Sequence, residues 1–214
     1  MLKQILICID KDGTIVYDKR YHLGHQPNWK SKVKLLDNVV KGIRKLNKLN
    51  NTKIYIATNQ PGVAIKDLKL LTKEKAELVC QFIIERLEKQ NAIVNGYEVC
   101  GKVSPKYIKE KKQQGKTYKF DKKLTGNFSC IKPKPGMVYS IMKKENLPAN
   151  TKIYFLGDRA SDVKTSINAK GFGILIPFPN RPDEIEKTKK LKSTKKYIAK
   201  DFMDACNFII KREK

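Results

Sequence analysis

The chain has 214 residues, of which 46 are lysine or arginine and 21 are aspartate or glutamate, so its formal net charge at pH 7 is +25. Its hydrophobic fraction of 40 % is too high for a disordered chain, and it contains no uncharged apolar run of the roughly 18 residues that a membrane-spanning helix needs. The apolar run at the start is too short for a signal peptide and ends at Asp10, so we expect a cytoplasmic protein with no membrane partner.

The positive charge has two interpretations. Lysine and arginine neutralise phosphates, which favours a nucleic-acid binder. A lysine-rich composition can also be a habit of the source organism. Most of the basic residues are lysine, whereas base recognition and bidentate phosphate contacts favour arginine, so charge alone leaves both interpretations open.

The first half of the chain alternates apolar runs with helical spacing. Residues 4–9 form a continuous apolar run, typical of a strand that is buried on both faces, and residues 37–49 carry apolar side chains at helical spacing. Residues 53–57 predict a second strand, and Thr72 can cap a long helix that reaches about Gln90.

The second half begins with a polar, lysine-rich stretch at about 101–131, which shows little periodicity and predicts an inserted basic loop. Pro135 can open a helix that reaches Glu145. A basic segment at about 186–200, with seven lysines against one glutamate, is expected to be a solvated linker. The remaining expected elements are a strand at 152–156, a short helix from Ser161 or Asp162 to about Gly171, strands at 173–176 and 197–199, and a helix from Asp201.

Strands that alternate with helices predict an α/β fold, a doubly wound and mostly parallel sheet with helices on both faces. We expect a single domain over residues 1–214. Ligands of such sheets bind beyond the carboxyl ends of the strands, and three expected strand ends carry Asp10, Thr58 and Asp158.

The five cysteines are odd in number, widely spaced and without a Cys-x-x-Cys pair. They therefore signal neither a disulfide framework nor a zinc knuckle. Cys8, Cys80 and Cys206 lie in apolar patterns and are expected to be small core residues.

Asp10 and Asp12 form the first of four polar elements. Carboxylates two residues apart leave a strand on the same side, and the pair is costly unless a cation lies between them or one carries a proton. Gly13 then allows a sharp turn. Taken alone, Asp-Gly is equally a simple turn signal.

The other three elements follow later strand ends or precede a helix. Thr58 and Asn59 offer hydrogen bonds to phosphoryl oxygens, and Lys132 offers a cation. Asp158 and Asp162 add two carboxylates, although Asp162 could simply cap a helix. Each element is weak alone, but their order at successive strand ends is specific.

Together these elements resemble the four motifs of the haloacid dehalogenase superfamily of phosphotransferases. Residues 10–14, 58–62, 132–137 and 157–162 look like the subgroup that contains D-glycero-D-manno-heptose 1,7-bisphosphate phosphatase and histidinol-phosphate phosphatase. The resemblance covers about residues 3–176. It implies a Rossmann-like fold without a large cap domain, usually as a monomer.

The resemblance implies a catalytic role for each of four residues. Asp10 would attack phosphorus and form an aspartyl-phosphate, and Asp12 would serve as general acid and then as general base. Thr58 would orient the transferring oxygens, and Lys132 would stabilise the developing charge.

It also implies a Mg²⁺ site and two substrate contacts. Asp10, Asp158 and the backbone carbonyl of Asp12 would hold Mg²⁺, while Asp162 would support that site or hold Lys132. The expected substrate contacts are Asn59 and Arg159.

One departure from the subgroup concerns zinc. Many of its members bind a structural zinc through Cys-x-His and a later Cys-x-Cys; here Cys100 and Cys130 match two ligands, but Lys102 and Phe128 hold the other two places. Two thiolates are not the four-ligand set of a structural zinc, so we expect none. The arginine that often precedes the motif lysine is Ile131 here, so its substrate contact is not carried over.

The leading prediction is a Mg²⁺-dependent phosphatase of a small phosphorylated metabolite, a sugar phosphate or bisphosphate such as heptose bisphosphate. Histidinol phosphate is an alternative substrate. A nucleic-acid 3′-phosphatase, resembling the phosphatase domain of polynucleotide kinase, is favoured by the charge but opposed by the absence of an evident aromatic platform for bases. A non-enzymatic basic binding module is opposed by the intact catalytic set. Between residues 102 and 134, 11 lysines face two acidic residues, a net +9 beside the expected site.

Overall fold

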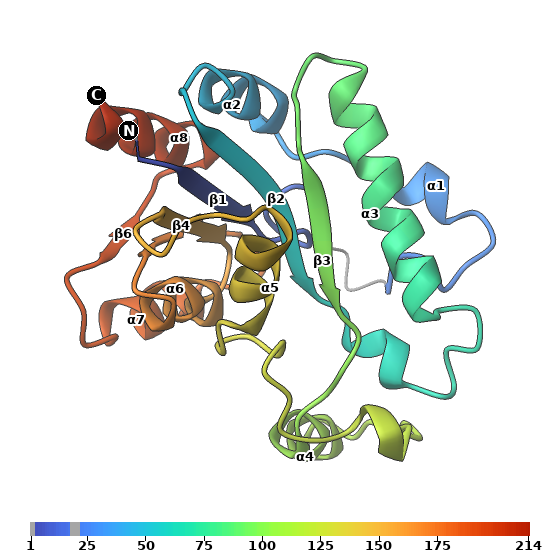
Figure 1. The fold of residues 1–214 in the computed structure, drawn as a ribbon. Coiled ribbons are helices and arrows are strands. Elements are labelled where there is room, and N and C mark those ends of the chain that lie inside the picture. The colour runs from blue at the N-terminus through green and yellow to red at the C-terminus, as the bar shows by residue number, and fades with distance from the viewer. Residues whose placement is uncertain (1–2, 18–21) are drawn as a thin grey trace.

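The computed structural model describes residues 3–17 and 22–214, and these form one parallel sheet covered by helices on both faces (Figure 1). The strand order in the described residues is β3-β2-β1-β4-β5-β6, and every pairing is parallel. The strands are β1 (Ile5–Ile9), β2 (Thr52–Asn59), β3 (Gly96–Cys100), β4 (Lys152–Gly157), β5 (Phe172–Leu175) and β6 (Lys196–Ile198). The helices are α1 (Trp29–Lys32), α2 (Val39–Leu46), α3 (Lys73–Glu88), α4 (Pro105–Gln113), α5 (Gly136–Lys144), α6 (Ala160–Asn168), α7 (Asp183–Lys189) and α8 (Phe202–Glu213), with short 3₁₀ helices η1 (Pro61–Ala64) and η2 (Lys122–Leu124).

Strand β1 lies in the middle of the sheet and is buried along its whole length. Its alternate side chains enter two hydrophobic cores, as the two-residue period of a strand requires. Ile5, Ile7 and Ile9 pack in the core that α2, α3 and α8 cover, whereas Leu6 and Cys8 pack in the core that α5 covers. The continuous apolar run of the sequence therefore corresponds to a strand covered on both sides.

Side-chain caps fix the start of three helices. Thr72, Ser104 and Asp201 each accept a hydrogen bond from the backbone N–H three residues later, at 3.2, 3.1 and 2.8 Å. Such caps satisfy N–H groups that have no partner within the helix. The predicted helices that begin at Thr72 and Asp201 are thereby confirmed.

Two elements, β3 and α7, are not among those that the sequence predicts. Strand β3 is an edge strand whose first three residues are only partly buried, so it lacks the continuous apolar run of the other strands. Segment 186–200 is not a linker, because α7 ends within it and β6 pairs with β5. Three acidic residues in the first turn of α7 suit a helix start.

The expected basic loop contains a helix. Residues 101–131 form a projection, here called the basic lobe, that includes α4 and η2 and lies beyond the carboxyl end of β3 (Figure 1). Helix α4 buries none of its residues, which explains why its sequence shows no apolar periodicity. The signal that was available is Ser104-Pro105, a cap followed by proline in the first turn.

Among the described helices, none combines the length and apolar character that a bilayer crossing requires.

Candidate active site

The polar ends of the central strands meet at one edge of the sheet. Asp10 follows β1, Thr58 lies near the end of β2 and Asp158 follows β4, and β1 pairs with both β2 and β4. Parallel neighbouring strands bring their carboxyl ends together, so residues far apart in sequence become neighbours. Asp10, Thr58 and Asp158 are all buried there.

Lys132 is the cation at the centre of this cluster. Its Nζ lies 2.6 Å from Asp10 Oδ1 and 2.6 Å from Asp162 Oδ1, and it donates to the carbonyl of Ala57 at 3.2 Å. Burial acts to lower the pKa of Lys132, but the two carboxylates more than offset it and raise the pKa above its usual value. Lys132 therefore remains charged and holds the Asp10 carboxylate in place.

Asp10, Asp158 and Asp162 form a cluster that can hold a metal ion. One carboxylate oxygen from each lies within 4.8 Å of the others, and all three residues are buried. Asp158 Oδ1 is buried and has no hydrogen-bond partner among the described residues, which leaves an oxygen that can accept a cation. An all-oxygen, negatively charged set is the kind that Mg²⁺ prefers, so the residues fit the expected ion.

The pKa values in the cluster report the same excess of negative charge. Burial and the neighbouring charges of Asp10 and Asp162 raise the pKa of Asp158 to about 8. Burial also raises the pKa of Asp162, although Lys132 acts against the rise. Lys132 alone does not balance the three carboxylates.

Asp12 occupies a different environment from Asp10, and its side chain is not part of the three-carboxylate cluster. Its carboxylate lies 2.5 Å from Lys11 Nζ and accepts a hydrogen bond of 2.8 Å from Gln60 Nε2. Burial would raise the pKa of Asp12, but Lys11 and Gln60 lower it below its usual value. The carboxylate form suits the general-base half of a phosphatase cycle.

The segment after β2 positions other groups. Gln60 Nε2 also donates to Thr58 Oγ1 at 3.0 Å, so Gln60 joins Thr58 to Asp12. Asn59 Oδ1 accepts from the backbone N–H of Lys132 at 3.2 Å. In this structure Asn59 holds the segment that carries Lys132, and its expected substrate contact stays a prediction.

Lys11, Gln60 and Arg181 are site residues that the sequence reasoning did not assign. Arg181, from the segment between β5 and α7, forms an ion pair with Asp158. The sequence offered one indication of its role: arginine is rare in this chain, with six in total, and Arg181 follows a strand end in a proline-rich turn. Lys11 is almost fully buried beside Asp12, which neither composition nor periodicity indicates.

Two features require glycine at position 13: the positive φ of its backbone and the close approach of the Asp158 side chain. Its φ is +90°, and a Cβ atom there would lie 2.5 Å from Asp158 Oδ2. Any larger residue would push into the carboxylate cluster.

Two predicted site residues lie at the start of α6. Asp162 accepts a hydrogen bond of 3.0 Å from the backbone N–H of Arg159, so it caps the helix and pairs with Lys132 at once. The side chain of Arg159 is exposed at the edge of the site.

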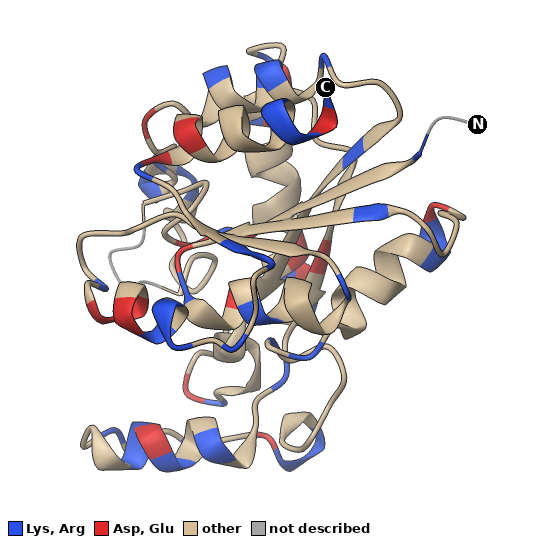
Figure 2. Ribbon diagram, turned by 90° about the vertical axis from the view of Figure 1, so that its left-hand side faces the viewer, with Lys and Arg blue, Asp and Glu red and all other residues tan. Residues whose placement is uncertain are grey.

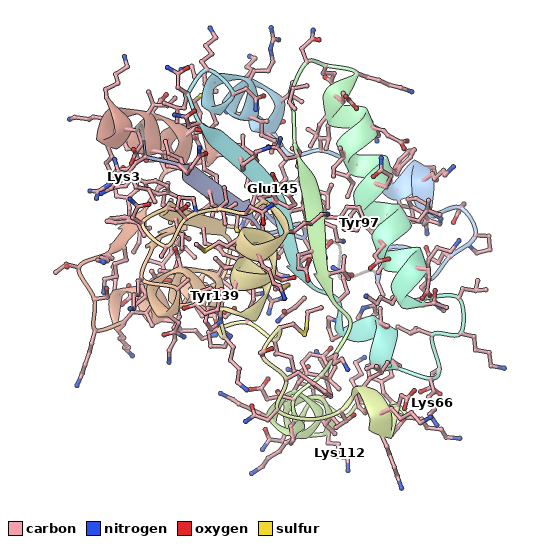
Figure 3. All side chains as sticks on the ribbon, in the orientation of Figure 1. Lys3, Lys66, Tyr97, Lys112, Tyr139 and Glu145 are labelled. Carbon is pink, nitrogen blue, oxygen red and sulfur yellow. A yellow bond between two sulfur atoms is a disulfide. The ribbon has the colours of Figure 1, made fainter. Side chains whose placement is uncertain are left out.

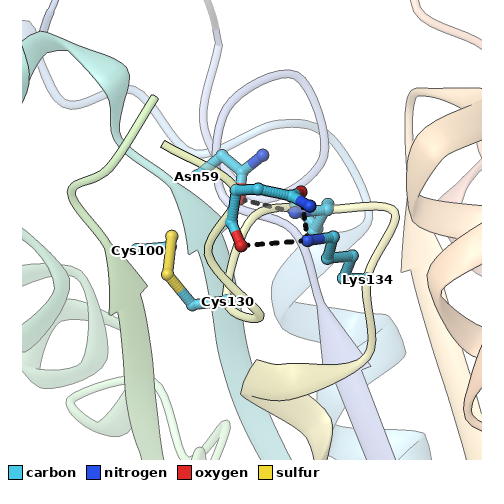
Figure 4. Close-up of a disulfide and its surroundings, with 6 residues drawn as sticks. Asn59, Cys100, Cys130 and Lys134 are labelled. Carbon is cyan, nitrogen blue, oxygen red and sulfur yellow. Dashed lines mark hydrogen bonds between the residues drawn. A yellow bond between two sulfur atoms is a disulfide. The ribbon is translucent and has the colours of Figure 1, made fainter. Parts of the chain in front are cut away.

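Four residues stand at the positions that hold zinc in the resembling subgroup. Here they form two contacts between residues 100–102 and residues 128–130. Cys100 and Cys130 form a disulfide (Figure 4), and the Lys102 ammonium lies 3.9 Å from the centre of the Phe128 ring. The expectation of no disulfide is therefore wrong for this pair, because β3 brings residues 30 apart within bonding distance. Cys8, Cys80 and Cys206 are free and buried, as predicted. The absence of a structural zinc stays a prediction.

Three known proteins illustrate the fold. D,D-heptose 1,7-bisphosphate phosphatase from B. bronchiseptica, determined with magnesium and phosphate, aligns with a TM-score of 0.72 at 16 % identity over 98 % of this chain and 99 % of its own. The D,D-heptose 1,7-bisphosphate phosphatase from Burkholderia thailandensis aligns with a TM-score of 0.54 at 14 % identity, over 97 % of this chain and 99 % of its own. A haloacid dehalogenase-like family hydrolase from Xanthomonas campestris aligns with a TM-score of 0.57 at 9 % identity, over 100 % of this chain and 97 % of its own.

At such low sequence identity these structural alignments establish the fold alone. No curated protein matches the chain significantly in sequence. The family follows from a different comparison. The sequence model of the polynucleotide kinase 3 phosphatase family matches residues 5–211, almost the entire chain. Together with the convergent carboxylates and Lys132, this match confirms the predicted haloacid dehalogenase fold and the phosphatase class. The chain belongs to the polynucleotide kinase 3 phosphatase family.

Proposed function

We propose that the protein is a Mg²⁺-dependent phosphomonoester hydrolase that works through an aspartyl-phosphate on Asp10. The observation that carries this proposal is the buried contact of Lys132 with Asp10 and Asp162, next to the unsatisfied Asp158 oxygen. Mg²⁺ held by Asp10 and Asp158 would neutralise phosphate charge and so permit one anion to approach another.

Asp10 would attack phosphorus through a carboxylate oxygen, breaking the bond to the leaving oxygen. Lys132 would hold Asp10 in line and stabilise the charge on the transferring group. Thr58, which is buried beside Gln60, would donate its hydroxyl proton to a phosphoryl oxygen. Each of these groups is held by a contact within the protein, so little reorganisation is needed when substrate binds.

Asp12 would move the protons. It would protonate the leaving oxygen and then take a proton from the water that hydrolyses the aspartyl-phosphate. Lys11 and Gln60 favour its ionised form, so the second step matches the resting state of the site. The first step requires Asp12 to gain a proton as substrate binds.

The substrate class separates two candidate functions. The predicted sugar bisphosphate has the support of the fold similarity to heptose bisphosphate phosphatases. The 3′-phosphate end of a nucleic acid has the support of the family match and of the +25 charge. We propose the nucleic-acid end as the first substrate to test and the sugar bisphosphate as the second, for an enzyme that acts as a cytoplasmic monomer.

The test is a phosphate-release assay with p-nitrophenyl phosphate, a heptose bisphosphate, histidinol phosphate and a 3′-phosphorylated oligonucleotide, each with Mg²⁺ and with EDTA. We expect Mg²⁺-dependent turnover that Asp10→Asn abolishes, and we expect acid-stable labelling of the native enzyme by ³²P-substrate in a rapid quench. Wild-type turnover by Asp10→Asn would contradict the mechanism. Turnover of the sugar bisphosphate alone would exclude the nucleic-acid substrate.

A further inference from the structure

We propose that the basic lobe, residues 101–131, is a binding surface for the single-stranded nucleic acid that leads to the phosphate at Asp10. The inference deepens the proposed function and rests on its nucleic-acid substrate. The surface consists of an aromatic row and a groove lined with lysine, and neither belongs to the carboxylate cluster.

The lobe lies at the same edge of the sheet as the active site. It leaves the end of β3 and returns to Lys132, and it is fixed to η1, the segment that follows Thr58. The N–H of Lys66 donates to the carbonyl of Lys119 at 2.8 Å, and the N–H of Asp121 donates to the carbonyl of Ala64 at 2.9 Å. Figure 3 shows Lys66 and Lys112 at this end of the molecule. Its attachments to the scaffold give the lobe a defined position beside the catalytic residues.

Three aromatic rings form a row within the lobe. Tyr107 and Phe120 lie with their ring centres 6.3 Å apart, and Tyr118 lies 6.3 Å beyond Phe120, both pairs edge to face. The rings come from α4 and from the segment before η2, so the sequence does not show them as one group. The sequence analysis did not detect this group of rings, and its capacity to stack on bases is part of the proposal. All three side chains are partly exposed and can present a face or edge to a base.

A shallow groove of about 460 Å³ lies beside two of the three rings. Tyr118 and Phe120 line it together with Lys112 and Lys122, so apolar rings and ammonium groups face the same space. Both lysines are exposed. Stacking surfaces flanked by positive charge are the arrangement that binds single strands without reading their sequence.

Both ends of the lobe join the active site. The carbonyl of Cys100, the residue before the lobe, accepts from the backbone N–H of Gln60 at 2.8 Å, and the side chain of Gln60 bonds to Asp12. Ile131, the last residue of the lobe, directly precedes Lys132. A strand bound on the lobe would therefore lie beside the carboxylate cluster.

The charge of the lobe suits a polymer better than a small sugar phosphate. Nine lysines lie in residues 101–131 against Glu110 and Asp121, and Figure 2 shows them as blue bands along α4 and the adjoining segment. A molecule with one or two phosphates has no need of so many cations spread over a projection. A chain of phosphates would use them in succession.

The binding test uses Asp10→Asn, so that no turnover occurs, and a fluorescent, 3′-phosphorylated single strand of about 12 nucleotides. The groove variant is Lys112→Glu with Lys122→Glu. The matched control is Lys41→Glu with Lys48→Glu, which makes the same charge change at exposed positions in or next to α2. We expect the groove variant to raise Kd about tenfold more than the control. We also expect it to lower the salt slope by about 0.7 for each phosphate that no longer pairs with a lysine.

A second pair of variants tests stacking. Tyr118→Ala should raise Kd about tenfold, whereas Tyr118→Phe, which keeps the ring, should not. Equal weakening by the groove and control variants, equal binding of Tyr118→Ala and Tyr118→Phe, or equal affinity for a poly-glutamate peptide would each overturn the proposal. Hydrolysis of p-nitrophenyl phosphate by the native enzyme tests the chemistry separately, so failure of the lobe and failure of the catalytic proposal remain distinguishable.

Discussion

The carboxylate cluster and the basic lobe hold their positive charge in opposite ways. Lys132 is buried and contacts two carboxylates at 2.6 Å. Most lysines of the lobe are exposed, and α4 buries none of its residues. In the cluster the position of the charge matters most, because a buried charge is costly without a well-placed partner. In the lobe the proposed binding depends on the number and spread of the charges, because solvent screens each of them.

This difference predicts very different sensitivities to mutation. A small change in the cluster should cause a large loss of activity, whereas the lobe should lose binding in small steps. The four predictions that follow test that contrast, from the largest expected effect to the smallest.

Lys132→Met should reduce kcat by about 10²- to 10³-fold, because it removes the lysine that contacts both Asp10 and Asp162. The methionine keeps most of the buried stem, so the loss reports the charge. Lys134→Met is the matched control: Lys134 lies two residues later, and its ammonium donates to the backbone carbonyl and the side-chain oxygen of Asn127. The measurement is kcat of the two variants with p-nitrophenyl phosphate, each compared with the native enzyme. Equal losses would mean that the effect comes from the loop and not from the catalytic charge.

The disulfide joins the end of β3 to the end of the lobe, and its removal should affect stability more than chemistry. Cys100→Ala with Cys130→Ala should lower the free energy of unfolding by about 3 kcal/mol, because the bridge closes a loop between residues 30 apart in sequence. Urea unfolding of the native protein with and without dithiothreitol should show a similar loss. A native midpoint that does not respond to reductant would contradict the bridge, since the other cysteines are free.

The same contrast explains what the sequence could predict. Asp10, Thr58 and Asp158 were recognisable at the ends of apolar strands, whereas Lys132 was recognisable only through the resemblance to the four superfamily motifs. The structure brings Lys132 into contact with Asp10 and places Asp158 in the same cluster. The edge strand β3, by contrast, has no apolar run to reveal it. The disulfide and the aromatic row depend on contacts between residues distant in sequence, which periodicity does not detect.

Arg181 shows the same limit inside the site. Its ion pair with Asp158 depends on how the segment after β5 folds back across the strand ends, and that segment has no periodic pattern. Helix α4 is different, because Ser104-Pro105 is a start signal that its polar composition outweighed in the prediction.

Gly13→Ala and Gly115→Ala compare the two regions directly. Both glycines have positive φ, +90° and +72°, so each alanine carries a similar backbone penalty of about 1–2 kcal/mol. At Gly13 the new Cβ would also meet Asp158 Oδ2 at 2.5 Å, whereas at Gly115 no atom of residues 3–17 or 22–214, apart from its chain neighbours, lies within 4 Å. We expect about a tenfold loss of kcat/KM for Gly13→Ala beyond any change in Gly115→Ala. Equal activities, measured at matched folded fractions, would show that the cluster tolerates displacement.

Glu145→Gln should have the smallest effect, and it depends on pH. Tyr55 donates to Glu145 and Lys53 lies 3.0 Å away, and these contacts lower the pKa of Glu145 below its usual value. A lowered folded pKa contributes stability above the unfolded pKa, and this stability is lost as the pH falls through the folded value. At pH 7 the native protein should therefore be more stable than Glu145→Gln by about 1 kcal/mol or less, because a partly exposed ion pair is weak. This difference in the free energy of unfolding should disappear below about pH 4. Urea midpoints at both pH values measure this, and a gap that widens in acid would contradict the assignment. Because Glu145 pairs with Tyr55 and Lys53 and not with the carboxylate cluster, the variant also measures a partly buried ion pair outside the site, against which the losses at Lys132 and Gly13 are judged.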